Sequence, residues 1–211
     1  AGKIYYSAKN TGVNRCERAL WFDESNLSTH WAAASIDYVR QKGLMHNNPY
    51  GEFTPNFPLT RGMFVTCLGR LAEVEGDAAS TGYRDLSADH YAAPYAAWAK
   101  EADIMRGLPD GRFAPDAPIT RQELATALAR YAALCGAERG DTSAPVYNDQ
   151  AAIADWAKDS VALCGQLGLL VGANGTFSPT DTATRAMGAV ILQRLDEADL
   201  RPQPVENGSN I

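Results

Sequence analysis

Hydrophobic and polar positions follow the same two-helix pattern three times along the chain. The first half of each copy is an alanine-rich stretch whose apolar residues recur at helical spacing, as Ile36 and Val39 or Val161 and Cys164 do. The second half begins at a threonine and carries apolar residues 4, 7, 8 and 11 positions later, which predicts a second helix with one buried stripe. We expect the first helices within residues 31–45, 91–105 and 156–170.

A loop rich in glycine, asparagine and proline joins the two predicted helices of each copy. In each loop a glycine stands two residues before a phenylalanine and a proline two residues after it. The glycine permits a positive φ and the proline stiffens the loop, so we expect the phenylalanine to plug the loop onto the helices. The three sets are Gly51, Phe53 and Pro55; Gly111, Phe113 and Pro115; and Gly175, Phe177 and Pro179.

The dipeptide Thr-Arg opens each second helix. Thr60, Thr120 and Thr184 are predicted N-caps, and only the middle copy completes a capping box, with Glu123. A positive charge there opposes the helix dipole, but an arginine beside the free N–H groups of a helix N-terminus forms an anion site. The candidate ligand residues are therefore Arg61, Arg121 and Arg185. A second interpretation stays equally open, in which these arginines cap the preceding loop or pair with aspartates.

Three more sets of side chains occupy repeated positions. They are the aromatics Trp31, Tyr91 and Trp156, the aspartates Asp23, Asp85 and Asp149, and the arginines Arg70, Arg130 and Arg194. The pattern favours a core position for the aromatics, with a ligand platform as the alternative. The aspartates are interpreted as turn or cap residues. The second arginine set points away from the first, and we expect it to form intramolecular ion pairs.

The repeats predict an all-α fold of three helix–loop–helix hairpins, each too small to bury its stripe alone. Three units pack most simply around a pseudo-threefold axis, and an open solenoid is the alternative. The expected boundaries are an extension at 1–20, units at 21–75, 83–135 and 147–199 that form one domain, and a tail or linker at 200–211.

Composition narrows the function classes. The 211 residues are 45% hydrophobic and 21% charged, which suits a folded chain with a core, and the net charge of −6 argues against a nucleic-acid partner. No apolar run approaches the ~20 residues of a membrane span, so membrane insertion is not expected.

The sequence motifs give no support for catalytic activity, a metal site or a cofactor. The histidines at 30, 46 and 90 lie in no hydrolase or zinc motif, and the four cysteines form no C-x-x-C pair. We therefore expect a non-catalytic chain with no catalytic residue, metal site or cofactor. Cys67 and Cys164 are interpreted as core residues, whereas a disulfide between Cys16 and Cys135 stays open.

The motifs together resemble the S-layer homology (SLH) domain of bacterial surface proteins. The clearest stretch is GLPDGRFAPDAPITRQELATALARY at 107–131, and PLTRGMFVTCLGRL and TATRAMGAVILQRL resemble clostridial variants. The resemblance implies a pseudo-trimer around a central three-helix bundle and an extracellular place in the cell wall or S-layer. It also implies binding to anionic, often pyruvylated, secondary cell-wall polysaccharide linked to peptidoglycan. The arginines of Thr-Arg, in grooves between units, are the implied ligand residues. We expect the ligand-binding set to include the three N-cap threonines, Glu123, the three repeated aromatics, Gly107 and Gly172 as well.

Departures from the family pattern predict unequal grooves. The family's glutamate survives only as Glu123, with Met63 and Met187 in its place elsewhere, and the glycine found at Gly107 and Gly172 is Asn47 in the first unit. We expect the groove that uses Arg121 to be the most family-like. The alternative function is a scaffold for binding other surface-layer proteins, with degenerate grooves. A third hypothesis is that the module anchors a separate enzyme encoded beyond this chain.

Overall fold

A computed structural model describes residues 27–75, 81–137 and 143–202, and within them the fold is all-α. The described ranges contain isolated β-bridges but no strand. The expected extension at 1–20, Cys16, Asp23 and the end of the tail lie outside these ranges. The helices are η1 (Leu27–Thr29), α2 (Ala33–Gln41), α3 (Arg61–Leu71), α4 (Ala93–Glu101), α5 (Arg121–Leu134), η2 (Gln150–Ala152), η3 (Asp155–Ala157), α6 (Lys158–Gln166) and α7 (Arg185–Glu197).

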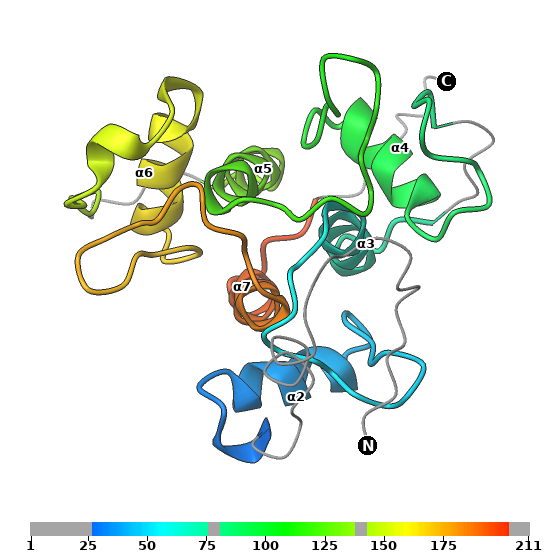
Figure 1. Cartoon of the computed structure of the whole chain (residues 1–211), viewed down its shortest axis with the longest axis horizontal. Helices are drawn as coiled ribbons and strands as arrows, with labels where there is room; N and C mark the ends of the chain where they lie inside the picture. The colour runs from blue at the N-terminus through cyan, green and yellow to red at the C-terminus, as the bar shows by residue number, and fades with distance from the viewer. Residues whose placement is uncertain (1–26, 76–80, 138–142, 203–211) are drawn as a thin grey trace, which may run out of the picture.

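The three second helices stand around the centre, and the first helices lie outside them (Figure 1). This arrangement confirms the central bundle and excludes the open solenoid. Each first helix packs on the second helix of the preceding unit: α4 on α3, α6 on α5, and α2 on α7. The expected hairpin, in which the two helices of one unit pack on each other, was therefore wrong. Periodicity identifies the apolar face of a helix but not the neighbour that covers it.

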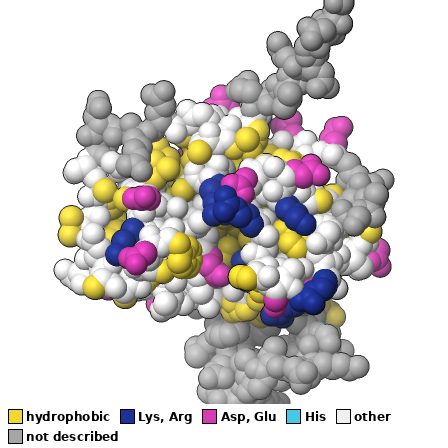
Figure 2. Space-filling view, turned by 90° about the horizontal axis from the view of Figure 1, so that it is seen from above, with side chains coloured by type: hydrophobic (Ala, Val, Ile, Leu, Met, Phe, Trp, Pro, Cys, Tyr) yellow, Lys and Arg dark blue, Asp and Glu magenta, His cyan; other side chains and the backbone are white. Residues whose placement is uncertain are grey.

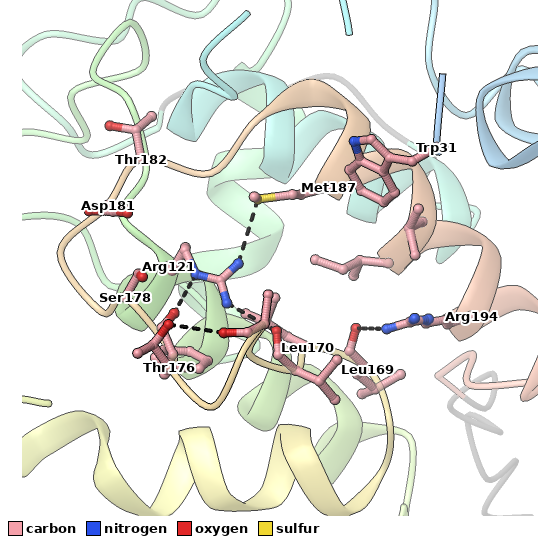
Figure 3. Close-up of a pocket in the computed structure, with 15 residues that line it drawn as sticks. Trp31, Arg121, Leu169, Leu170, Thr176, Ser178, Asp181, Thr182, Met187 and Arg194 are labelled. Atoms are coloured by element: carbon pink, nitrogen blue, oxygen red, sulfur yellow. Dashed lines mark hydrogen bonds between the residues drawn. The ribbon is translucent and has the colours of Figure 1, made fainter. Parts of the chain in front are cut away.

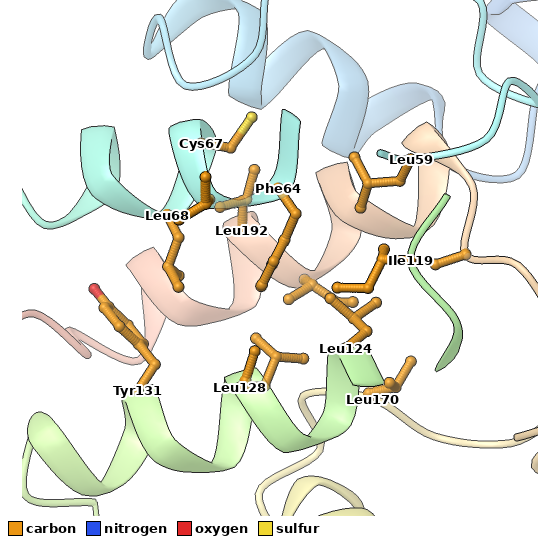
Figure 4. Packing of buried hydrophobic residues seen from close by; sticks show 14 of the residues in the cluster. Leu59, Phe64, Cys67, Leu68, Ile119, Leu124, Leu128, Tyr131, Leu170 and Leu192 are labelled. Atoms are coloured by element: carbon orange, nitrogen blue, oxygen red, sulfur yellow. The ribbon is translucent and has the colours of Figure 1, made fainter. Parts of the chain in front are cut away.

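Apolar side chains from all three central helices meet on the axis (Figure 4). Phe64 and Leu68 of α3, Leu124 of α5 and Leu192 of α7 are almost completely buried. The hydroxyl of Tyr131 donates to the carbonyl oxygen of Leu200 at 3.0 Å, which satisfies the polar end of a buried ring. Each unit thus contributes to one shared core.

A triangle of main-chain hydrogen bonds closes the ring of units just before the central helices. The amide of Ile119 donates to Leu59, the amide of Leu59 to Ala183, and the amide of Ala183 to Ile119, at 2.8–2.9 Å. Because each residue belongs to a different unit, the first and third units are joined as the others are. The Thr-Arg dipeptides follow directly, so the triangle fixes all three helix starts relative to one another.

The helix starts and loops follow the sequence pattern. The side chains of Thr60, Thr120 and Thr184 accept from the amide three residues on, and Glu123 closes the only capping box among these three starts. The loop glycines have φ of 86°, 82° and 76°, and the three phenylalanines are fully buried. These predictions are confirmed.

Candidate functional site in the grooves between units

Each arginine of a Thr-Arg dipeptide reaches the loop of the next unit around the ring. The Nε of Arg61 donates to the carbonyl oxygen of Phe113 at 2.8 Å. Arg121 and Arg185 do the same with Phe177 and Phe53, at 2.7 and 2.8 Å. All three arginines are only 7% exposed. The predicted capping of the preceding loop was therefore wrong, because each arginine binds the loop of the next unit. We call each of these junctions between two units a groove, and ligand binding there stays a prediction.

The first amides of the central helices are already occupied. In α5 the amide of Arg121 donates to Asp181 and that of Gln122 to Pro179, at 2.9 and 3.0 Å. The corresponding amides of α3 and α7 donate to neighbouring loops as well. The expected free N–H groups were therefore wrong for these positions, and an anion in the groove would have to bind the guanidinium.

Arg121 is a buried cation without a carboxylate partner among the described residues. Its Nη2 donates to the carbonyl oxygen of Val171 at 3.0 Å, and its Nη1 faces the sulfur of Met187 at 3.6 Å. The guanidinium carbon lies 4.8 Å from the ring centre of Phe177. Burial lowers the pKa of Arg121 below its usual value, since desolvation disfavours the charged form. A bound anion would relieve that cost.

A pocket of about 470 Å³ opens beside this guanidinium. Figure 3 shows Arg121 on one side of the pocket and Trp31 on the other, with Met187 between them. Leucine and valine side chains form much of the wall, and Ser178, Asp181 and Thr182 also line the pocket. Arg121 comes from the second unit, the loop and α7 from the third, and Trp31 from the first. All three units therefore build this one site.

The repeated aromatics are exposed, which corrects their expected core position. Trp31, Tyr91 and Trp156 are 65%, 51% and 57% exposed. They precede the first helices instead of lying on their apolar stripes, because α2, for example, begins only at Ala33. A Cβ added at Gly62 would lie 3.0 Å from the hydroxyl of Tyr91, so this ring stands over the start of α3.

In the first two units, a histidine ring lies beside the ring of the repeated aromatic residue. The rings of His30 and Trp31 have centroids 5.5 Å apart, and those of His90 and Tyr91 are 4.4 Å apart. Each histidine Nδ1 accepts from the amide two residues on, at 3.2 Å. The imidazoles thus hold the aromatic side chains toward solvent, and the repeated His-aromatic dipeptide was the sequence signal for this.

Glu123 lies in the groove of Arg61 and not in that of Arg121. Its Oε1 is 3.8 Å from Nη1 of Arg61, while its Oε2 accepts from the amide and hydroxyl of Thr120 at 2.8 and 2.7 Å. The expectation that Arg121 has the most family-like groove rested on the adjacent Glu123 and is corrected here. Arg121 and Glu123 are only two residues apart in sequence, but their side chains lie in neighbouring grooves.

The third groove resembles that of Arg121 in its main-chain contacts. The Nη2 of Arg185 donates to the carbonyl oxygen of His46 at 2.8 Å, and its Nη1 faces the sulfur of Met63 at 3.8 Å. Its guanidinium carbon lies 4.6 Å from the ring centre of Phe53. Methionine therefore borders two grooves and glutamate the remaining one.

The two candidate glycines allow close packing of the loops. A Cβ at Gly107 would lie 2.5 Å from the ring of Tyr83, and one at Gly172 would lie 2.2 Å from the carbonyl oxygen of Thr176. Neither glycine lines the pocket beside Arg121. In the first unit Asn47 fills this position, and its side-chain Nδ2 donates to the carbonyl oxygen of Gly51 at 2.5 Å.

The repeated aspartates hold the loops that face the arginines. Asp85 accepts from the amides of Phe113 and Ala114 at 2.7 and 2.8 Å. Asp149 accepts from those of Phe177 and Ser178 at 2.8 and 2.7 Å. The expected turn or cap role was wrong for Asp149, which makes no side-chain bond to the helix that it precedes. The amides that it binds lie 28 and 29 residues away, on another loop.

Arg70, Arg130 and Arg194 bind main-chain carbonyls, so the expected ion pairs were wrong within the described part of the chain. Their Nη1 atoms donate to Leu44, Ile104 and Gly168, and Arg194 also reaches Leu169. These acceptors follow the C-terminal ends of the first helices, where carbonyls lack helical partners and a cation is favourable.

Charges elsewhere form no single basic surface on the face that Figure 2 shows, where lysine and arginine groups lie beside acidic ones. Across residues 27–75, 81–137 and 143–202, no three His, Cys, Asp or Glu side chains converge as metal ligands would. No helix in these ranges is both long and apolar enough to span a membrane.

Comparison with known proteins supports the family. Segments 27–62, 82–125 and 146–186 match the S-layer homology domain. The chain is 31% identical over 177 residues to an amylopullulanase of Thermoanaerobacterium thermosulfurigenes, covering 82% of this chain and 9% of that protein. It is 28% identical over 169 residues to the S-layer protein sap of Bacillus anthracis, covering 80% and 20%. A cellulosome-anchoring protein of Acetivibrio thermocellus is 34% identical over 100 residues, which cover 45% and 22%.

The chain thus spans at most about a fifth of these relatives' lengths. What they share with it is the repeated module, and this indicates a cell-surface anchoring role and a location at the cell wall or surface. Because the three matched segments together cover more than half of the sequence, the chain belongs to the S-layer homology domain family.

Proposed function

We propose that this module anchors a surface protein by binding anionic, pyruvylated secondary cell-wall polysaccharide in its inter-unit grooves. The observation that carries the proposal is the environment of Arg121. This buried cation has no carboxylate partner among the described residues and opens onto a pocket of about 470 Å³. A carboxylate on the sugar would supply a direct ion-pair partner for this guanidinium.

The two ends of the pocket suit two parts of such a ligand. A charged hydrogen bond to Arg121 contributes about 1.5–3 kcal/mol, which favours an acidic substituent. Trp31, at the other side, is 65% exposed and presents an apolar face on which a sugar ring can stack. Occupation of more than one groove along a repeating polymer would raise the overall affinity by about 10²–10⁴.

The chain itself is proposed to be non-catalytic. Catalytic activity, if the full-length protein has it, then belongs to a separate domain. A scaffold that binds other surface-layer proteins is the second candidate, because the ion pair between Arg61 and Glu123 already neutralises one groove. The scaffold predicts self-association or protein binding that does not depend on wall polysaccharide.

Co-sedimentation with purified bacterial walls that carry pyruvylated polysaccharide tests the proposal. We expect Arg121→Met to weaken binding at least about tenfold, since a charged hydrogen bond of ~1.5 kcal/mol or more is lost. Trp31→Ala should weaken binding without affecting folding, because the side chain is exposed. Mild acid treatment of the walls, which removes the ketals, should abolish binding by the unaltered chain.

The matched control is Arg40→Met, which removes the same charge from α2, where Arg40 pairs with Asp37 at 3.7 Å. Melting curves of all variants separate a loss of binding from a loss of folding. If Arg121→Met folds and co-sediments like Arg40→Met, or if acid-treated walls bind as well as untreated ones, the proposal is wrong.

A further inference from the structure

The grooves of Arg61 and Arg121 differ in charge at the third residue of the helix that borders each. In the Arg61 groove this residue is Glu123 of α5, whose Oε1 lies 3.8 Å from Nη1 of the arginine. In the Arg121 groove it is Met187 of α7, whose sulfur lies 3.6 Å from the same Nη1 atom. The same edge of the guanidinium thus faces a negative carboxylate in one groove and a neutral thioether in the other.

Two further contacts of the two arginines are alike, whereas the Nη2 of Arg121 also donates to the carbonyl oxygen of Val171 at 3.0 Å. Both Nε atoms donate to the carbonyl oxygen of a buried phenylalanine, at 2.8 and 2.7 Å. Both guanidinium groups lie over that phenylalanine ring, at 5.2 and 4.8 Å, and both arginines are 7% exposed. Asp181 lines the Arg121 pocket, but it is exposed and forms no ion pair with Arg121. Residue 123, compared with 187, is the clearest difference in charge beside the guanidinium.

Glu123 is held in place by more than its attraction to Arg61. Its Oε2 accepts from the amide and the hydroxyl of Thr120 at 2.8 and 2.7 Å, as the second half of a capping box. Moving away to admit a ligand would break these bonds. A ligand carboxylate that bound Nη1 of Arg61 would have to come close to a fixed like charge, which disfavours its binding.

We propose that Glu123 is a specificity-determining residue that acts as an internal occupant of the Arg61 groove, so that carboxylate ligands bind first in the Arg121 groove. The inference rests on the proposed function, because it ranks two grooves that must first bind an anion. Glu123, which belongs to the middle unit, then lowers the affinity for carboxylate ligands in the neighbouring Arg61 groove.

A reciprocal pair of substitutions tests this assignment. Glu123→Gln removes the charge but keeps an acceptor for the capping box, and Met187→Glu places the charge beside Arg121 with Thr184 as a ready cap. The buried Nε–H groups of Arg61 and Arg121 report each groove separately by NMR during titration. The probe is a 4,6-pyruvylated methyl hexopyranoside, with its neutral methyl ester as the control.

In the unaltered chain we expect the Arg121 signal to respond at about tenfold lower probe concentration than the Arg61 signal. Glu123→Gln should raise the affinity of the Arg61 groove for the probe about tenfold. Met187→Glu should lower the affinity of the Arg121 groove by a similar factor. Unchanged melting temperatures would show that the effect is not structural.

The possible outcomes distinguish a failure of this inference from a failure of the proposed function. If both grooves bind the probe but neither substitution changes their order, or if Glu123→Gln weakens the Arg61 groove, the inference is wrong and the proposed function stands. If no groove in any variant binds the charged probe more tightly than its ester, the proposed function fails and the inference fails with it.

Discussion

At the residue scale, the sequence indicated the local contacts of the repeated threonines. It did not indicate which residues the repeated arginines and aspartates contact. The threonine caps depend on atoms three residues away, and all three were predicted. Arg121 instead meets Phe177, which is 56 residues distant, and Asp149 meets an amide 28 residues distant. No local spacing encodes those contacts, because they arise only when three units close into a ring.

Asp149 gives a test of this long-range loop clamp. Hydrogen bonds from the amides of Phe177 and Ser178 are among the causes that lower the pKa of Asp149 below its ordinary 3.8. A carboxyl whose pKa is lowered by folding contributes stability above the unfolded pKa, and the contribution is lost as the pH falls through the folded pKa. We expect Asp149→Asn to lower the melting temperature at pH 7, and the two proteins to converge as the pH falls below about 3.8.

The control for this measurement is Asp116→Asn, which removes an exposed loop carboxylate from the second unit. Thermal unfolding from pH 7 to pH 2 compares the three proteins. A pH-independent gap between Asp149→Asn and the unaltered chain would show that the carboxylate charge does not hold the loop.

At the scale of elements, helix existence was predictable and helix pairing was not. The 3.6-residue period fixed six helices and their apolar faces, and the Thr-Arg starts were placed to the residue. The first helices begin later than their aromatics, which is why Trp31 was wrongly expected in the core. The neighbour of each first helix belongs to another unit, and an apolar stripe fits any helix of suitable shape.

Gly69 tests this pairing between units. A Cβ at Gly69 of α3 would lie 2.2 Å from Cδ1 of Tyr95 on α4, too close for any real contact. We expect Gly69→Ala to lower the free energy of unfolding by about 1–2 kcal/mol, because overpacking outweighs the gain of ~1 kcal/mol in helix propensity. In a Tyr95→Ala background the same change should be neutral or stabilising.

Urea unfolding of the four proteins in this double-mutant cycle measures the coupling. The cycle tests contact between units, since the two residues come from the first and second copies. Equal stabilisation by Gly69→Ala in both backgrounds would contradict the pairing of α3 with α4.

At the scale of the whole molecule, ring closure turns three weakly similar repeats into three unequal junctions between units. Each groove takes its arginine from one unit and its loop from the next, and in the Arg121 groove the aromatic, Trp31, comes from the first unit. A substitution in one repeat therefore alters its neighbour's groove, as Glu123 does for Arg61. The sequence predicted that the grooves differ, but their ranking requires knowing which unit supplies each wall.

The most direct test of the account is calorimetric titration of the intact chain with a 4,6-pyruvylated methyl hexopyranoside, alongside its neutral methyl ester. We expect the charged probe to bind and the ester to bind at least about tenfold more weakly, because a charged hydrogen bond contributes ~1.5 kcal/mol or more. Arg121→Met should remove the tightest binding while Arg40→Met leaves it unchanged. Equal binding of probe and ester, or undiminished binding in a folded Arg121→Met variant, would contradict the claim that this module holds an acidic glycan in its inter-unit grooves.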